Sequence, residues 1–89
     1  MPYINQEDRE KYKSHINDLV DLLTNDGGSF KVGEVNYVLS SIIWKLFQNK
    51  VSYTNANNLI GVLECVKQEF IRRKLNDYED EKIKSNGDL

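Results

Sequence analysis

Three segments of this chain repeat apolar residues with the period of an α-helix, and this pattern constrains the fold more than any other feature. The strongest repeat lies between residues 31 and 49, where apolar residues recur at every third or fourth position. Its positions are Val35, Val38, Leu39, Ile42, Ile43 and Leu46. The only proline, Pro2, lies outside all three segments, so no proline interrupts them. We therefore predict an all-α fold.

The first segment begins at a residue that favours a helix N-terminus. Asn5 is a preferred N-cap residue, and Asp8 stands at the capping-box position three residues later. The apolar face consists of Tyr12, Ile16, Leu19, Val20 and Leu23. The sequence Asn-Asp-Gly-Gly at residues 25–28 should end this helix, because glycine adopts the left-handed C-cap conformation without strain.

The third segment begins after a second capping signal and contains a glycine. Ser52 or Thr54 can cap a helix that continues to about Leu75. Its apolar face consists of Leu59, Val62, Leu63, Val66 and Phe70. A glycine inside a soluble helix usually marks the close approach of another backbone or ring. We expect Gly61 to have this role, with Trp44 as a plausible ring.

Length and charge divide the chain into a helical body and a tail. At 89 residues it is one domain, and three helices of about 17–22 residues would form a bundle with a modest core. We predict a three-helix bundle-like domain over residues 1–76. Residues 77–89 should form an acidic C-terminal segment that packs on the domain or on a neighbouring subunit, with a short helical turn around residues 78–84.

The net charge of −2 disfavours a strongly basic nucleic-acid-binding protein. This charge is uneven, because residues 1–76 carry +1 and residues 77–89 carry −3. A helix-turn-helix interpretation of the second and third helices is also disfavoured, because the third has no basic stripe along its length. No apolar run approaches the length of a membrane span, and residues 1–13 lack the apolar core of a signal peptide. We expect a cytoplasmic protein.

A second stripe on the central helix indicates self-association. Tyr37, Ser41, Trp44 and Gln48 recur at helical spacing, offset from the main apolar face. Two aromatic-bearing faces exceed what a lone three-helix bundle of this size needs. We therefore predict a homo-oligomer that associates through Tyr37 and Trp44.

The residues that catalyse reactions or bind metals are scarce. A single histidine, His15, and a single cysteine, Cys65, exclude a Cys-rich or His-rich metal site, and Cys65 is expected to be a small buried hydrophobe. Glu34 and Glu64 are interpreted as structural ion-pair partners or solvated side chains rather than an acid–base pair. Cations that could pair with them are Lys67, Arg72 and Arg73. We predict no enzyme, no metal site and no cofactor.

Two features could bind an anion. Arg72, Arg73 and Lys74 close the third helix, where cations offset the negative helix end, but where arginine could also hold a phosphate through two hydrogen bonds. The Gly-rich stretch at residues 26–29 precedes a helix N-terminus. It lacks the Gly-Lys-Ser/Thr sequence of a phosphate-binding loop, and we interpret it as an interhelical turn.

Several motifs together resemble a family of small proteins that tailed bacteriophages and prophages carry, and whose function is unknown. They are Met-Pro-Tyr-Ile at residues 1–4, Gly-Glu-Val-Asn-Tyr at 33–37, Gly-Val-Leu-Glu-Cys-Val-Lys at 61–67 with Arg72 and Arg73, Tyr-Glu-Asp at 78–80 with Lys82 and Ile83, and Asn-Gly-Asp at 86–88. The resemblance spans nearly the whole chain. It implies a phage protein in the cytoplasm of an infected bacterium, and it brings no catalytic residue.

This context implies two functions, which the sequence leaves open. One is an anti-defence sponge, a non-enzymatic helical oligomer that sequesters a small nucleotide-derived immune signal. Its binding residues would be Tyr37, Trp44 or Tyr78 for stacking the base, and Arg72, Arg73 and Lys82 for holding phosphate. The alternative is a protein–protein interaction module, such as an inhibitor of a host protein or a phage assembly factor.

Overall fold

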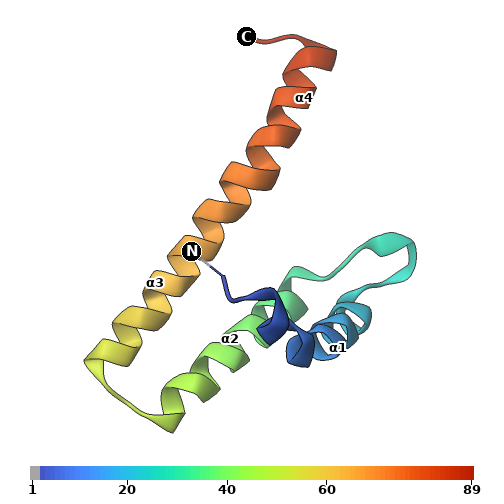
Figure 1. Ribbon diagram of the computed structural model, residues 1–89. Coiled ribbons are helices and arrows are strands. Elements are labelled where there is room, and N and C mark those ends of the chain that lie inside the picture. Colours follow the sequence, from blue (N-terminus) through green and yellow to red (C-terminus); the bar gives the residue numbers. More distant parts are fainter. Residues whose placement is uncertain (1–2) are drawn as a thin grey trace. The chain divides into compact units, whose positions relative to one another are not determined.

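The computed structural model describes residues 3–89, and all the secondary structure in this range is helical, without any strand (Figure 1). Met1 and Pro2, the first half of the Met-Pro-Tyr-Ile motif, lie outside the described residues. The chain forms two compact units, one that ends at Asn49 and one from Lys50 to Leu89. The predicted all-α class is therefore confirmed, and each unit is considered by itself below.

Helix α1 (Gln6–Leu23) begins at the predicted position but not through the predicted cap. Asn5 is the N-cap residue, yet its side chain makes no capping hydrogen bond. The backbone N–H of Asp8 instead donates to the carbonyl of Asn5 at 3.1 Å. The Arg9 guanidinium folds back and donates to the carbonyl of Ile4 from Nε at 3.1 Å and from Nη2 at 3.0 Å. An arginine thus ties down the chain that leads into the helix.

The C-terminus of α1 differs from the prediction, because the glycines do not cap it. Thr24 is the C-cap residue with an extended backbone, and its hydroxyl donates to the carbonyl of Val20. Gly27 and Gly28 have φ values of 79° and 83° and form the short turn η1 (Asp26–Gly28) instead. The Asn25 N–H closes this turn on the carbonyl of Ser29 at 2.7 Å. Positive φ is therefore needed in the connection rather than at the helix end.

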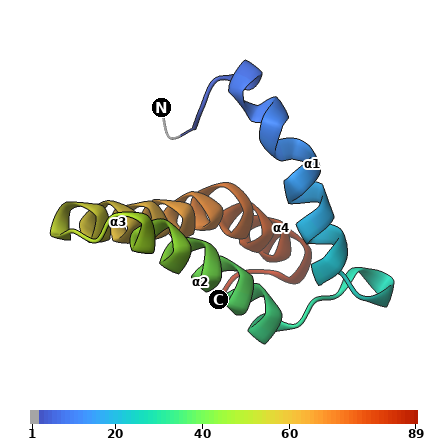
Figure 2. The same ribbon diagram turned by 90° about the horizontal axis from the view of Figure 1, so that it is seen from below.

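Helix α2 (Val32–Asn49) agrees with the predicted segment to within one residue. Gly33 lies in its first turn, where glycine costs less than in the helix interior. The N–H groups of Glu34 and Val35 both donate to the carbonyl of Lys31, at 3.1 and 3.2 Å. Figure 2 shows α1 and α2 diverging from the turn that connects them.

The second unit is one helix that runs from Tyr53 to Asn86 without a break. It consists of α3 (Tyr53–Phe70), the π-helical turn η2 (Ile71–Leu75) and α4 (Asn76–Asn86). We call it the long helix, and its length is about 50 Å. Figure 1 shows it as a continuous ribbon from yellow to red.

The start of the long helix was predicted correctly, and its end was not. Ser52 is the N-cap residue, and its side chain accepts a hydrogen bond from the Asn55 N–H at 3.0 Å. The helix was expected to stop near Leu75 and to be followed by a short turn. It continues for eleven more residues, because no helix breaker follows until Gly87, whose φ is 86°.

No residue among 3–89 is buried, so the predicted core faces are exposed or half-buried. Leu19, Leu23, Val38, Ile43 and Leu59 are half-buried, whereas other members of the same faces are exposed. Those exposed members include Ile16 at 56%, Val66 at 62% and Phe70 at 63%. The second unit shows the reason, because a single helix cannot bury its own apolar side chains. The expected packed core is therefore not present within the described units.

Candidate functional site

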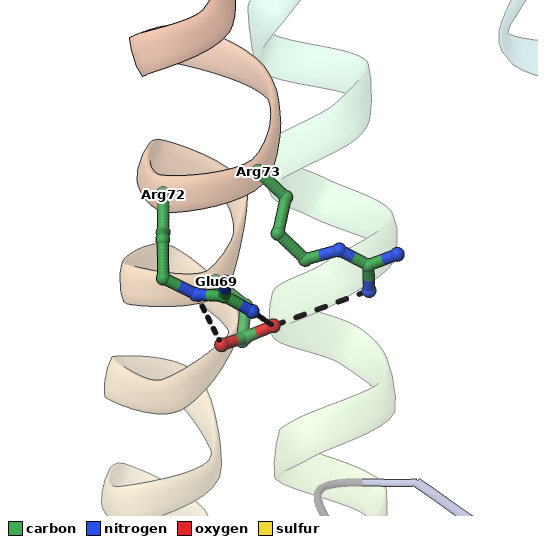
Figure 3. Close-up of polar contacts among 3 residues, drawn as sticks. All are labelled: Glu69, Arg72 and Arg73. Atoms are coloured by element: carbon green, nitrogen blue, oxygen red, sulfur yellow. Dashed lines mark hydrogen bonds and ion pairs between the residues drawn. The ribbon is translucent and has the colours of Figure 1, made fainter.

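The Arg72–Arg73 cluster of the long helix is held by a carboxylate from the preceding turn (Figure 3). Arg72 donates to Glu69 from Nε to Oε1 at 3.2 Å and from Nη2 to Oε2 at 3.0 Å. Arg73 Nη1 lies 4.0 Å from Glu69 Oε2. The Glu69 side chain is 27% exposed, whereas those of Arg72 and Arg73 are 69% and 50% exposed. The arginines therefore form one ion-pair group with Glu69.

This arrangement sets the charge of Glu69. The hydrogen bond from Arg72 is the main cause that lowers the pKa of Glu69, and the charges of Arg72 and Arg73 lower it further, whereas partial burial opposes them. Glu69 thus stays ionised to a lower pH than an isolated glutamate. An external anion would have to share the two guanidinium groups with a carboxylate already bound there.

Tyr78 and Lys82 form a second contact on the same helix. The Lys82 ammonium lies 5.5 Å from the centroid of the Tyr78 ring, which is within cation–π distance. A surface hollow beside them is lined by Asp77, Tyr78, Glu81, Lys82 and Ser85. Two carboxylates thus border the ring and the ammonium that were predicted to bind a nucleotide.

The remaining predicted binding residues lie in the other unit. Tyr37 and Trp44 are seven residues apart on α2, so they share one face, and they are 73% and 68% exposed. The structure therefore brings Arg72 close to Arg73 and Tyr78 close to Lys82 along one helix. Tyr37 and Trp44 form an exposed surface on α2.

Other residues singled out from the sequence lie at the surface. Cys65 is an exposed free thiol, so its prediction as a buried hydrophobe was wrong. Its position explains the error, because a residue beside an apolar face is covered only if another element packs there. Glu64 accepts a hydrogen bond from Gln68 Nε2 at 3.0 Å and lies 3.9 Å from Lys67 Nζ, in agreement with a structural ion pair. His15 and Glu34 are exposed.

Sequence reasoning missed Glu69 as a member of the cluster. The signal was its spacing, because residues three and four positions apart are neighbours on a helix surface. Glu69 precedes Arg72 by three residues and Arg73 by four. The space beside Gly61 gives a second difference, since a Cβ there would meet no other atom of residues 3–89 within 4 Å. No close approach explains this glycine in the described part of the chain.

The described residues show neither a metal-binding cluster nor a membrane-spanning helix. Within residues 3–89, no three His, Cys, Asp or Glu side chains gather as a metal site would require. None of the described helices combines the length and the apolar character needed to cross a membrane.

Comparison with known proteins gives one family. No curated protein and no solved structure matches the chain significantly. The family model for a domain of unknown function, DUF6899, matches residues 1–89. Because the match covers the whole sequence, the chain belongs to the DUF6899 family.

Proposed function

We propose that this protein is a protein–protein interaction module whose helix faces are covered by a partner protein. The observation that carries the proposal is the exposed apolar surface of α2. This helix has apolar side chains over much of its circumference, yet Leu39, Ile42 and Leu46 are 54%, 43% and 52% exposed. Tyr37 and Trp44 form a second exposed surface on another side of the same helix. Exposed apolar surfaces of this kind are typical of interaction sites.

The chemistry of the surface supports binding rather than catalysis. Aromatic side chains such as Trp44 and Tyr37 are enriched at the centres of protein interfaces, where they contribute most of the binding energy. The lowered pKa of Glu69 is explained by the hydrogen bond and the charges of its arginine neighbours. Such a shift is a property of an ion pair, and it does not indicate an acid–base catalyst.

The fluorescence of Trp44 tests this proposal, because it is the only tryptophan. At micromolar protein concentration we expect Trp44 to emit at the short wavelengths of an indole that a second copy of the chain covers. Dilution should separate the copies and shift the emission to longer wavelengths. Tyr37→Asp should give long-wavelength emission at every concentration, since it places a charge on the same face as Trp44, seven residues away. Leu22→Asp is the matched control, because Leu22 is 79% exposed and lies off the α1 apolar face. It should behave as the unaltered protein.

Two outcomes would contradict the proposal. Long-wavelength emission at every concentration would mean that no second copy of the chain covers Trp44 on α2. Short-wavelength emission that dilution does not change would mean that the chain covers its own α2 face.

A second candidate function is the sequestration of a small nucleotide-derived signal in a phage-infected cell. The observation in its favour is the alignment of four predicted binding residues along the long helix, where Arg72 and Arg73 are followed by the stacked pair Tyr78 and Lys82. An aromatic ring and guanidinium groups are the side chains that stack bases and hold phosphates. Assembly of several chains would bring several such sets together.

Thermal unfolding with a panel of cyclic nucleotides and ADP-ribose derivatives tests this second candidate. At about 100 times its Kd, a ligand stabilises the folded state by about 2.7 kcal/mol, so the Tm should rise by several degrees. Arg73→Gln with Lys82→Gln should abolish that rise, whereas Lys11→Gln with Lys13→Gln on α1 should leave it unchanged. A panel at about 100 micromolar with no effect on the Tm would count against sequestration and would leave the interaction module standing.

A further inference from the structure

In residues 69–84 of the long helix, the signs of the charges in the first half are the reverse of those in the second half when the second half is read backwards. We pair the residues of this segment by counting inward from its two ends, Glu69 and Lys84. Each charged residue is then paired with one of opposite sign, except Lys82 and Asp77, which are paired with uncharged residues. The pairs are Glu69 and Lys84, Phe70 and Ile83, Ile71 and Lys82, Arg72 and Glu81, Arg73 and Asp80, Lys74 and Glu79, Leu75 and Tyr78, and Asn76 and Asp77. The centre of the pattern lies between Asn76 and Asp77.

The chain cannot use this complementarity within its own long helix. Residues 69–76 and 77–84 follow one another in an unbroken helix, so the two halves never lie side by side. A second copy in the antiparallel direction would place each half beside the other. A parallel copy in register would place every charge beside its like, which is destabilising.

An apolar face lies at the centre of the pattern. Leu75, Tyr78 and Lys82 are spaced by three and four residues, which is the spacing of a helix–helix seam, and Ile71 precedes Leu75 across the π-helical turn. The cation–π contact between Lys82 and Tyr78 agrees with their sharing one side of the helix. Leu75 and Tyr78 are 40% and 60% exposed, so both are accessible to a second copy.

The flanks of this face carry opposite charges at one heptad of separation. Arg72 and Glu79 lie seven residues apart on one flank, and Lys74 and Glu81 lie seven apart on the other. In an antiparallel pair, residues on corresponding flanks meet. Arg72 of one copy therefore approaches Glu79 of the second copy, and Lys74 approaches Glu81, each two residues from its match in the count because that match lies on the other flank.

We infer that a second copy of this chain pairs with residues 69–84 in the antiparallel direction, centred between Asn76 and Asp77. Leu75 packs against Tyr78 of the second copy, and the two sets of flanking charges fix the direction and the register. This inference rests on the proposed function, because it names one partner of the interaction module. It concerns the long helix, whereas the Trp44 experiment concerns α2, so either can fail alone.

Charge reversal tests the pairing. Arg72→Glu with Lys74→Glu should weaken self-association by about tenfold or more, because like charges then meet at both flanks. Glu79→Lys with Glu81→Lys should have the same effect. The protein with all four substitutions should associate as the unaltered protein does, since each pair is restored with the signs exchanged. Lys11→Glu with Lys13→Glu on α1 is the control and should leave association unchanged.

Sedimentation measures the association in this experiment, and circular dichroism checks that every variant remains helical. Association that neither double variant weakens would overturn the inference, as would a fourfold variant that is as weak as the doubles while fully helical. If the long-helix variants had no effect while Tyr37→Asp exposed Trp44, the interaction module would stand without this pairing.

The direction of the pair can be measured separately with a spin label on Cys65, the only cysteine, which is exposed. In the antiparallel pair the two labels lie about 35 Å apart, because each is more than eleven residues from the centre. Parallel helices would place them within about 20 Å, side by side at the usual interhelical spacing. The shorter distance would overturn the antiparallel assignment.

Discussion

A cluster of cations has different meanings depending on the residues one helical turn before it. From the sequence, Arg72, Arg73 and Lys74 could be interpreted as an anion-binding cluster or as cations that offset the negative end of a helix. In the structure the helix does not end there, and Glu69 holds both guanidinium groups from the preceding turn. The positive charge of the cluster is therefore partly neutralised within the chain. The positive charge of residues 72–74 that Glu69 does not neutralise is balanced by the acidic residues further along the same helix.

Substitution of Glu69 should reveal this ion pair through its pH dependence. Because the folded-state pKa of Glu69 is lowered, ionised Glu69 stabilises the helix above its unfolded pKa of about 4.3. Glu69→Gln should therefore reduce helix content modestly at neutral pH, since solvent screens an exposed pair. As the pH falls below about 4.3 and through the lower folded-state pKa, the two proteins should converge.

Circular dichroism across an acid titration checks this expectation. High salt should also reduce the difference, because it screens the pair. The double variant Glu69→Gln with Arg72→Gln should lose less helix than the sum of the losses in the two single variants, because each single variant already breaks the same ion pair. A difference between Glu69→Gln and the unaltered protein that persists unchanged at acidic pH would show that the carboxylate charge has no role.

The helices were predicted best where local signals and periodicity agree. The bounds of α2 follow from its apolar repeat, and Ser52 caps the long helix as its position indicated. The end of the long helix was misplaced because the apolar repeat fades after Leu75. Helical structure there requires no apolar face, since residues 76–86 contain neither glycine nor proline and carry charges at helical spacing.

What could not be predicted is which molecule covers each apolar face. A periodic stripe such as Val35 to Leu46 shows that one side of a helix needs to be covered. It contains no information on whether the cover is another helix of the chain, a second copy or a different protein. The expectation that Cys65 is buried failed for this reason, since it assumed a cover within the chain. The candidate binding residues were likewise predicted as types, without Glu69, because their neighbours decide what they can bind.

At the scale of the whole molecule, no residue among 3–89 is buried, and our proposal is that association supplies the missing burial. A folded domain is stabilised mainly by apolar surface removed from water, and the described units remove little of it alone. If partners supply the missing burial, folding and association are one equilibrium. The stability of such a protein has meaning only at a stated protein concentration.

We therefore expect the Tm to rise with protein concentration. For an obligate pair of chains of this length, a tenfold increase should raise the Tm by roughly 4 °C, because association contributes about 1.4 kcal/mol per tenfold change to a transition whose entropy scales with both chains. Differential scanning calorimetry over a hundredfold range of concentration measures this slope. Arg72→Glu with Lys74→Glu should lower the Tm most at low concentration, whereas the matched α1 control should not. A Tm that is constant over the range would mean that each chain folds alone, with its apolar faces covered from within.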